Sequence, residues 1–371
     1  MKLLNVLLTL GCAGSTFALT SIEFAKQLGF GWNLGNTLEA CGDWINGKTT
    51  QQYETAWGNP VTSEKLIKAV KSYGFNTIRI PVAWSNLMLA DYTINPLLLN
   101  RVAEVVGYVV NNDMYAIMNI HWDMGWFSWF SEPEKEEEAF KKYTKVWTQI
   151  SEHFKDFSDH LIFESLNEQG CWDNVWNTYN NNGSKSKAYD LLNNINQRFV
   201  DIVRASSGNN PNRYLLLAGY CTGLDLTMDE AYVFPKDDKL MVSVHYYSPS
   251  TFAILEEDAD WGKCARTWGT EAEVNNVIYD FSRLKNYFVT ERGIPVIIGE
   301  YGTPTTNKEP ESIHKYLKTV ASTALEYDLC PVVWDAGQYF DRRNLKFKDP
   351  EVGMIYKELA ATYNNNNDNG K

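Results

Sequence analysis

The sequence predicts a single-domain α/β protein with a (β/α)8 barrel, the TIM-barrel class of fold. Eight short apolar stretches alternate with helical stretches along the chain. No linker rich in proline or serine divides them, and 371 residues suffice for one large barrel. A doubly wound open sheet is the alternative. It is disfavoured because the segment NLGNTLE, in the first strand and the turn after it, has neither the GxGxxG nor the P-loop spacing.

The predicted strands are apolar runs that end at turn signals or at polar residues. They comprise residues 29–36, 76–82, 115–123, 161–169, 213–220, 240–249, 294–302 and 329–338. The predicted helices have apolar residues at helical spacing, and several begin at a capping residue. They comprise residues 63–74, 95–112, 135–157, 185–206, 271–291, 309–328 and 350–362.

The two ends of the chain differ in composition from the rest. Residues 1–18 combine a lysine, an apolar run and small residues before Ala18, which is the pattern of a secretory signal peptide. The barrel domain is then expected over residues 19–363. The Asn-rich segment 364–371 is expected to be a disordered tail or the start of a linker to a further module. We therefore expect a secreted, extracellular protein.

Composition excludes several classes of partner. The formal net charge of −12 argues against binding to nucleic acid or to an anionic membrane. No apolar run reaches the roughly 20 residues that span a bilayer. The chain has 13 Trp and 21 Tyr, whose flat apolar faces with a polar edge suit the faces of sugar rings. These features fit a protein that acts on a neutral polymer.

Cysteines limit the covalent chemistry. Six occur, at positions 12, 41, 171, 221, 264 and 330. Cleavage after Ala18 would leave five, which allow up to two disulfides with one thiol over. Cys330, in the apolar run CPVVW, is the expected buried thiol. No CxxC motif or His/Cys cluster is present, so no metal site is expected. One glycosylation sequon begins at Asn182.

Polar side chains occur near the end of nearly every predicted strand. These residues are Asn36, Arg79, His121, Asn167, Glu168, His245, Tyr247, Glu300 and Trp334. Burying such groups is costly unless they have partners. Because the carboxyl ends of all strands meet at one face of a barrel, we expect these side chains to converge there in an active site.

Glu168 and Glu300 form the central pair of this site. They end the fourth and seventh strands, which lie on roughly opposite sides of an eight-stranded barrel. Two carboxyl groups that flank a glycosidic bond supply an acid and a nucleophile, and their separation decides the stereochemistry. Arg79 and Tyr247 are residue types that would keep Glu300 ionised. Asn167 is expected to hold a sugar 2-hydroxyl group, and Trp334 to stack beneath the sugar.

The ordered series from Arg79 to Trp334, with the segments GFGWNLGNTLEA and RIPVAW, resembles glycoside hydrolase family 5. It is most similar to the endoglucanase branch found in rumen bacteria and anaerobic fungi, from about Gly29 to Trp334. The resemblance implies that Glu168 is the general acid/base and Glu300 the nucleophile of a retaining double displacement. It also implies hydrolysis of internal β-1,4 bonds of cellulose and related β-glucans without a cofactor, and we expect a monomer. Two positions depart from the family pattern. Trp122 follows His121 where a second histidine is frequent, and Gln169 follows Glu168 where proline is common.

Alternatives remain open at the level of substrate. The same scaffold would serve a mannanase, a xylanase or a xyloglucanase, because hydroxyl contacts and cleft shape decide between them. A barrel that binds polysaccharide without cleaving it is a further alternative, disfavoured because a binder has no need of paired carboxyls. Trp44, Trp57 and Trp122 are candidate aromatic residues of the cleft.

Overall fold

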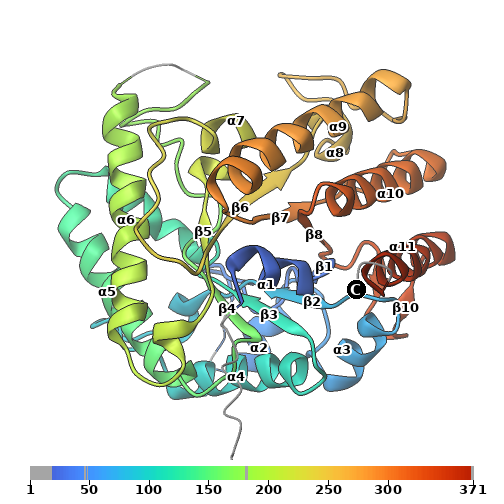
Figure 1. The fold of residues 1–371 in the computed structure, drawn as a ribbon. Helices are drawn as coiled ribbons and strands as arrows, with labels where there is room; N and C mark the ends of the chain where they lie inside the picture. Colours follow the sequence, from blue (N-terminus) through green and yellow to red (C-terminus); the bar gives the residue numbers. More distant parts are fainter. Residues whose placement is uncertain (1–18, 46, 48, 180–182, 369–371) are drawn as a thin grey trace, which may run out of the picture.

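Eight parallel strands form a closed barrel in the computed structural model, in the order in which they occur in the chain (Figure 1). The structure describes residues 19–45, 47, 49–179 and 183–368, and for 364–368 the backbone alone. The strands are β1 (Gly31–Asn33), β2 (Thr77–Ile80), β3 (Tyr115–Met118), β4 (Leu161–Glu164), β5 (Leu215–Ala218), β6 (Leu240–Tyr246), β7 (Val296–Tyr301) and β8 (Cys330–Val333). Pairing of β1 with β8 closes the ring. The predicted (β/α)8 barrel is confirmed.

Helices surround the ring of strands (Figure 1). The long helices are α3 (Glu64–Lys71), α4 (Pro96–Val110), α5 (Glu136–Phe154), α6 (Lys185–Ala205), α9 (Glu271–Leu284), α10 (Pro310–Glu326) and α11 (Pro350–Asp368). The short ones are α1 (Ser21–Gln27), α2 (Thr50–Glu54), α7 (Leu224–Thr227) and α8 (Ser250–Ala253). A two-stranded antiparallel sheet of β9 (Phe340–Asp341) and β10 (Lys346–Phe347) precedes α11. No described helix has the length and apolar character needed to cross a membrane.

The elements differ from the prediction in three places. The strands are shorter than expected, because the chain leaves the ladder where the polar residues begin. After β5 the chain forms the single-turn helix α7, where no helix was predicted. Helix α11 continues to Asp368, so the backbone of 364–368 is helical where a disordered tail was expected. The predicted signal peptide, residues 1–18, and the sequon at Asn182 lie outside the described residues.

Capping residues define where the helices begin. The side chain of Ser63 accepts a hydrogen bond from the Leu66 N–H at the start of α3. Gly74, shortly after the end of this helix, has a φ of 98°, which glycine adopts at little cost. Ser63 therefore begins α3, and Gly74 lets the chain turn after it.

Side chains alternate between the inside and the outside of the barrel along each strand. In β3, Ile117 belongs to a small apolar cluster inside the barrel, whereas Ala116 and Met118 pack outward in the main core. Helix α1 covers one end of the inner cluster, where Phe24 stacks on Tyr214 with ring centroids 3.6 Å apart. Figure 1 shows α1 over the middle of the ring of strands.

The inward positions become polar toward the carboxyl ends of the strands. In β4, Ile162 lies in the inner cluster and Glu164, two residues later, is fully buried. In β6, Met241 and Ser243 have the same relationship. Buried charges are stable only when they are paired and hydrogen-bonded. The fold therefore places a layer of polar groups directly beneath the mouth of the barrel.

One disulfide joins described residues. Cys171 and Cys221 are bonded, with Cα atoms 6.1 Å apart. Cys41, Cys264 and Cys330 are free thiols, and Cys330 is buried as expected. The second disulfide that the cysteine count allowed does not form among these residues.

Candidate active site

Arg79 is at the centre of the polar layer. Its Nε donates to Glu164 Oε2 at 2.7 Å, and its Nη2 donates to Asn167 Oδ1 at 2.8 Å. Its Nη1 donates to Asn33 Oδ1 at 3.0 Å and to Glu300 Oε1 at 2.8 Å. All three nitrogens of this buried guanidinium group are therefore engaged, so Arg79 is held rigidly against strands β1, β4 and β7.

Glu300 receives a hydrogen bond on each oxygen. Tyr247 Oη donates to Oε2 at 3.0 Å, while Arg79 occupies Oε1. A register shift after Val244 pairs His245 with Glu300 across β6 and β7, which brings both side chains to the barrel mouth. Burial raises the pKa of the Glu300 carboxyl, while the charges of His245 and Arg79 oppose that rise.

Glu168 lies opposite Glu300 and is more exposed. Its Oε1 shares a hydrogen bond with His245 Nδ1 at 2.6 Å, and 49% of its side-chain surface is accessible. One carboxylate oxygen of Glu168 lies within 4.8 Å of one of Glu300. Burial raises the pKa of Glu168, but the hydrogen bond and charge of His245 outweigh it, and the net pKa is lowered.

His121 and Trp334 form a second wall of the site. Their rings are parallel, with centroids 5.7 Å apart and an angle of 4° between the planes. Burial, with smaller contributions from the charges of Arg79 and His245, lowers the pKa of His121 well below its usual value. A neutral His121 adds no further positive charge to a site that already contains Arg79.

A cavity of about 670 Å³ opens between these walls. Six of the predicted site residues line it, together with residues of the loops that follow β6, β7 and β8. The predicted ones are His121, Asn167, Glu168, Tyr247, Glu300 and Trp334. The loops add Ile254, Glu256, Thr305 and Gln338, among others. The structure thus brings both carboxyl groups and the aromatic platform to one open cleft.

Asn36 was expected among the supporting residues, and the structure places it elsewhere. Strand β1 ends at Asn33, which is the residue whose side chain contacts Arg79. Asn36 lies in the following turn with a φ of 53°, and its carbonyl accepts a hydrogen bond from Asn59. The predicted end of the first strand was wrong by three residues, and a supporting role for Asn36 stays a prediction.

The three candidate tryptophans do not line the cavity. Trp44 and Trp57 lie between β1 and α3, and Trp122 follows β3. The rings of Trp44 and Trp122 are more than half exposed. Any role for them at outer sugars stays a prediction. Asp123 and Asp335 are buried acceptors for backbone and side-chain donors, so they support their loops.

Sequence reasoning missed Glu164, which forms a buried ion pair with Arg79, as Glu300 does. The signal was present, because Glu164 interrupts the apolar run LIFE and lies on the same face as Ile162. A carboxyl group inside a buried strand requires a cationic partner, and Arg79 was the available one.

Three side chains with metal-ligating atoms gather in the described part of the chain: Glu168, His245 and Glu300. One atom of each lies within 4.8 Å of the others. Arg79 donates to one of these carboxylates, and its positive charge opposes the binding of a cation. The arrangement is better suited to moving a proton than to holding a metal.

Comparison with known proteins agrees with this arrangement. Residues 39–340 match the family model for cellulase (glycosyl hydrolase family 5). The chain belongs to glycoside hydrolase family 5. It is 37% identical to endoglucanase A of Paenibacillus barcinonensis over 360 residues, which cover 89% of this chain and 86% of that protein. This family 5 enzyme is therefore a glycoside hydrolase of the cellulase type.

Two solved structures of the family are close in fold. One is a GH5-4 broad-specificity endoglucanase from an uncultured bovine rumen ciliate, with a TM-score of 0.83 and 35% identity over 93% of this chain and 99% of that chain. The other is a mutant family 5 lichenase from Caldicellulosiruptor sp. F32 in complex with cellotetraose. It has a TM-score of 0.84 and 32% identity over 92% of this chain and 96% of that chain.

Proposed function

We propose that this protein is a secreted endo-β-1,4-glucanase that retains anomeric configuration, with Glu168 as general acid/base and Glu300 as nucleophile. The observation that carries the proposal is the approach of the two carboxylates to within 4.8 Å. Retaining enzymes keep the two carboxyl groups about 5–5.5 Å apart, whereas inverting enzymes need roughly 6.5–9.5 Å to admit a water molecule. Secretion is supported by the signal-peptide pattern of residues 1–18.

The reaction divides into two displacements. A Glu300 oxygen attacks the anomeric carbon while Glu168 gives its proton to the departing glycosidic oxygen, and a glycosyl ester forms on Glu300. Glu168 then takes a proton from water as the water oxygen attacks the same carbon and releases Glu300. Asn167 accepts from Arg79 through Oδ1, which leaves its amide N–H groups free to donate to a sugar hydroxyl.

Substrate binding is needed to place the catalytic proton on Glu168. The contact with His245 lowers the pKa of Glu168 and burial raises that of Glu300, the reverse of what an acid and a nucleophile need. A bound glucan would cover the half-exposed Glu168, and desolvation raises the pKa of a carboxyl group. Glu300 is already buried, and both of its donors remain in place. Binding therefore shifts the shared proton toward Glu168.

This shift predicts a difference between two pH profiles. Activity falls with rising pH when the acid loses its proton. We expect the basic limb of kcat, which reports the substrate complex, at higher pH than that of kcat/KM, which reports the free enzyme. Initial rates on a soluble β-glucan measure both limbs. A basic limb of kcat at the same or lower pH would contradict the proposed shift.

Tyr247→Phe tests how the ionised nucleophile is stabilised. The change removes one of the two donors to Glu300, so the pKa of Glu300 should rise and the acidic limb of kcat/KM should move to higher pH. A hydrogen bond to a charged group contributes about 1.5–3 kcal/mol, which corresponds to a loss of roughly ten- to hundred-fold in kcat/KM. Tyr246→Phe is the matched control, because its hydroxyl bonds Asp280 outside the site. An unmoved acidic limb in Tyr247→Phe would show that Tyr247 does not act on Glu300.

The substrate class is tested on purified protein with soluble β-1,4-glucan, mixed-linkage β-glucan, xyloglucan, mannan and xylan. The related structures described as a broad-specificity endoglucanase and a lichenase support the first two as preferred substrates. We expect viscosity to fall early relative to the release of reducing ends, as internal cleavage requires. Preference for mannan or xylan would identify a mannanase or a xylanase on the same scaffold. Binding without any release of reducing ends would identify a non-catalytic barrel.

A further inference from the structure

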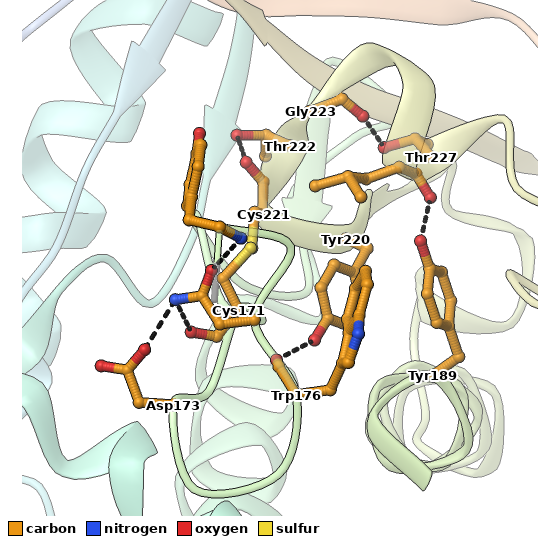
Figure 2. The surroundings of a disulfide bond; sticks show 12 residues. Cys171, Asp173, Trp176, Tyr189, Tyr220, Cys221, Thr222, Gly223 and Thr227 are labelled. Atoms are coloured by element: carbon orange, nitrogen blue, oxygen red, sulfur yellow. Dashed lines mark hydrogen bonds between the residues drawn. A yellow bond between two sulfur atoms is a disulfide. The ribbon is translucent and has the colours of Figure 1, made fainter. Parts of the chain in front are cut away.

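The loop that follows Glu168 is tied to the neighbouring strand by a covalent bond. Cys171 lies three residues after Glu168, and its disulfide partner Cys221 lies at the carboxyl end of β5, 50 residues further along the chain (Figure 2). The bond therefore joins the loop of the fourth strand to the loop of the fifth at the rim of the cleft.

Backbone contacts hold the same short segment against Cys221. The Cys221 N–H donates to the Gln169 carbonyl at 3.0 Å. Gly170 has a φ of 127°, and a Cβ atom there would lie 2.9 Å from the Cys221 nitrogen. The Gln169 side chain in turn accepts from the Asn167 N–H at 2.6 Å. Gln169 and Cys171 are thus bonded to Cys221, Asn167 is bonded to Gln169, and Gly170 has no room for a side chain against Cys221.

The backbone at the disulfide is in a conformation that needs such support. Cys171, Cys221 and Thr222 have φ values of 47°, 48° and 49°, in the left-handed region that side chains other than glycine rarely adopt. Such residues stay there only when the surrounding structure fixes them. Without the cross-link the segment is free to relax toward negative φ, which would move the residues next to Glu168.

The outer part of the loop has its own anchors. Trp172 and Trp176 pack against Tyr220, with ring centroids 6.1 and 5.7 Å away. Tyr220 Oη donates to the Trp176 carbonyl, as Figure 2 shows. These contacts do not depend on the sulfur bridge. Loss of the disulfide should therefore leave the loop packed while releasing the segment beside Glu168.

We propose that the Cys171–Cys221 disulfide is a positioning pair that sets the location of the Glu168 carboxyl group for proton transfer. The Glu168 side chain is half exposed. Its hydrogen bond with His245 Nδ1, at 2.6 Å, holds only the carboxyl end, so the position of this group also depends on the backbone that carries the side chain. Displacement of a catalytic group by about 1 Å can cost 100-fold in rate. The inference rests on the proposed role of Glu168 as the acid/base.

The test compares two cellobiosides that differ in their need for an acid. An unactivated alkyl or glucosyl leaving group must be protonated, whereas dinitrophenolate leaves without a proton. We expect the Cys171→Ser/Cys221→Ser variant to lose about ten- to hundred-fold in kcat/KM on the unactivated substrate and less than about three-fold on the dinitrophenyl substrate. Cys264→Ser, which alters a free thiol on the β6–α9 connection, is the matched control and should behave as wild type.

Reduction of the wild-type protein gives the same readout without depending on how the variant folds. A dithiol reductant converts the bond to two thiols and is itself oxidised to its cyclic disulfide. The same leaving-group-dependent loss is expected in the wild type, and no effect in the double serine variant. Equal losses on both substrates, or no loss on either, would overturn the positioning role. Glu168→Gln is run in parallel: if it shows no dependence on the leaving group, the assignment of the acid fails instead.

Discussion

Glu300→Gln is expected to reduce kcat on soluble β-1,4-glucan by at least about 10⁴-fold, because removal of a covalent nucleophile costs this much or more. The amide has the shape of the carboxylate and still offers an oxygen to Arg79 Nη1, so the fold should persist. It has no charge and cannot form the glycosyl ester. Reducing-end release at saturating substrate measures the loss.

Glu311→Gln is the control for this variant, since Glu311 is an exposed carboxylate in the first turn of α10. It should keep wild-type activity, and the two variants should have the same melting temperature within a few degrees. Retention of more than about a tenth of the activity in Glu300→Gln would show that another group attacks the anomeric carbon.

Glu168→Gln is expected to lose about 10²–10⁴-fold in kcat/KM on β-glucan, the usual contribution of a positioned general acid. On a dinitrophenyl cellobioside the loss in kcat/KM should be far smaller, because glycosylation then needs no proton. His245 Nδ1 can still bond the amide, so the position of the side chain is kept. Steady-state kinetics on the two substrates provide the measurement.

A loss of the same size on both substrates would remove Glu168 from the role of acid. It would then act on binding or on the pKa of Glu300, whose carboxylate it faces within 4.8 Å. The basic limb of the pH profile separates these cases, since only loss of the acid abolishes that limb on β-glucan.

The barrel could be predicted because short apolar strands alternate with helical stretches along the sequence. Each buried strand is a short apolar run, and nearly every run ends near a polar residue that is costly to bury without a partner. Glu168 and Glu300 could be paired for the same reason, because strands four and seven lie three positions apart, on roughly opposite sides of a ring of eight. Contacts that topology alone dictates were therefore available from the sequence.

Other features depend on contacts between distant parts of the chain, which the sequence pattern does not specify. Strand β1 ends at Asn33 and not at Asn36, and that end is set by pairing with β2 and β8. The disulfide partner of Cys171 could not be chosen among the remaining cysteines, since connectivity is not deducible from spacing.

The carboxyl groups of Glu168 and Glu300 at the barrel mouth each depend on several neighbouring residues. Arg79 is shared between Glu164 and Glu300, so only part of its charge acts on Glu300. Tyr247 supplies the remaining hydrogen bond, and His245 contacts Glu168 while approaching Glu300 to 3.6 Å. Each of these contacts acts on the pKa of one of the two carboxyl groups, and a double displacement requires those pKa values to differ.

Covalent trapping tests the central claim most directly. A 2-deoxy-2-fluoro cellobioside with a dinitrophenyl leaving group forms the glycosyl-enzyme quickly but hydrolyses slowly, because fluorine destabilises the oxocarbenium-like transition state. Mass spectrometry of the intact protein and of its peptides should find one added fluorocellobiosyl group, on the peptide that carries Glu300. A label on another residue, or no label together with initial products of inverted anomeric configuration, would contradict the account.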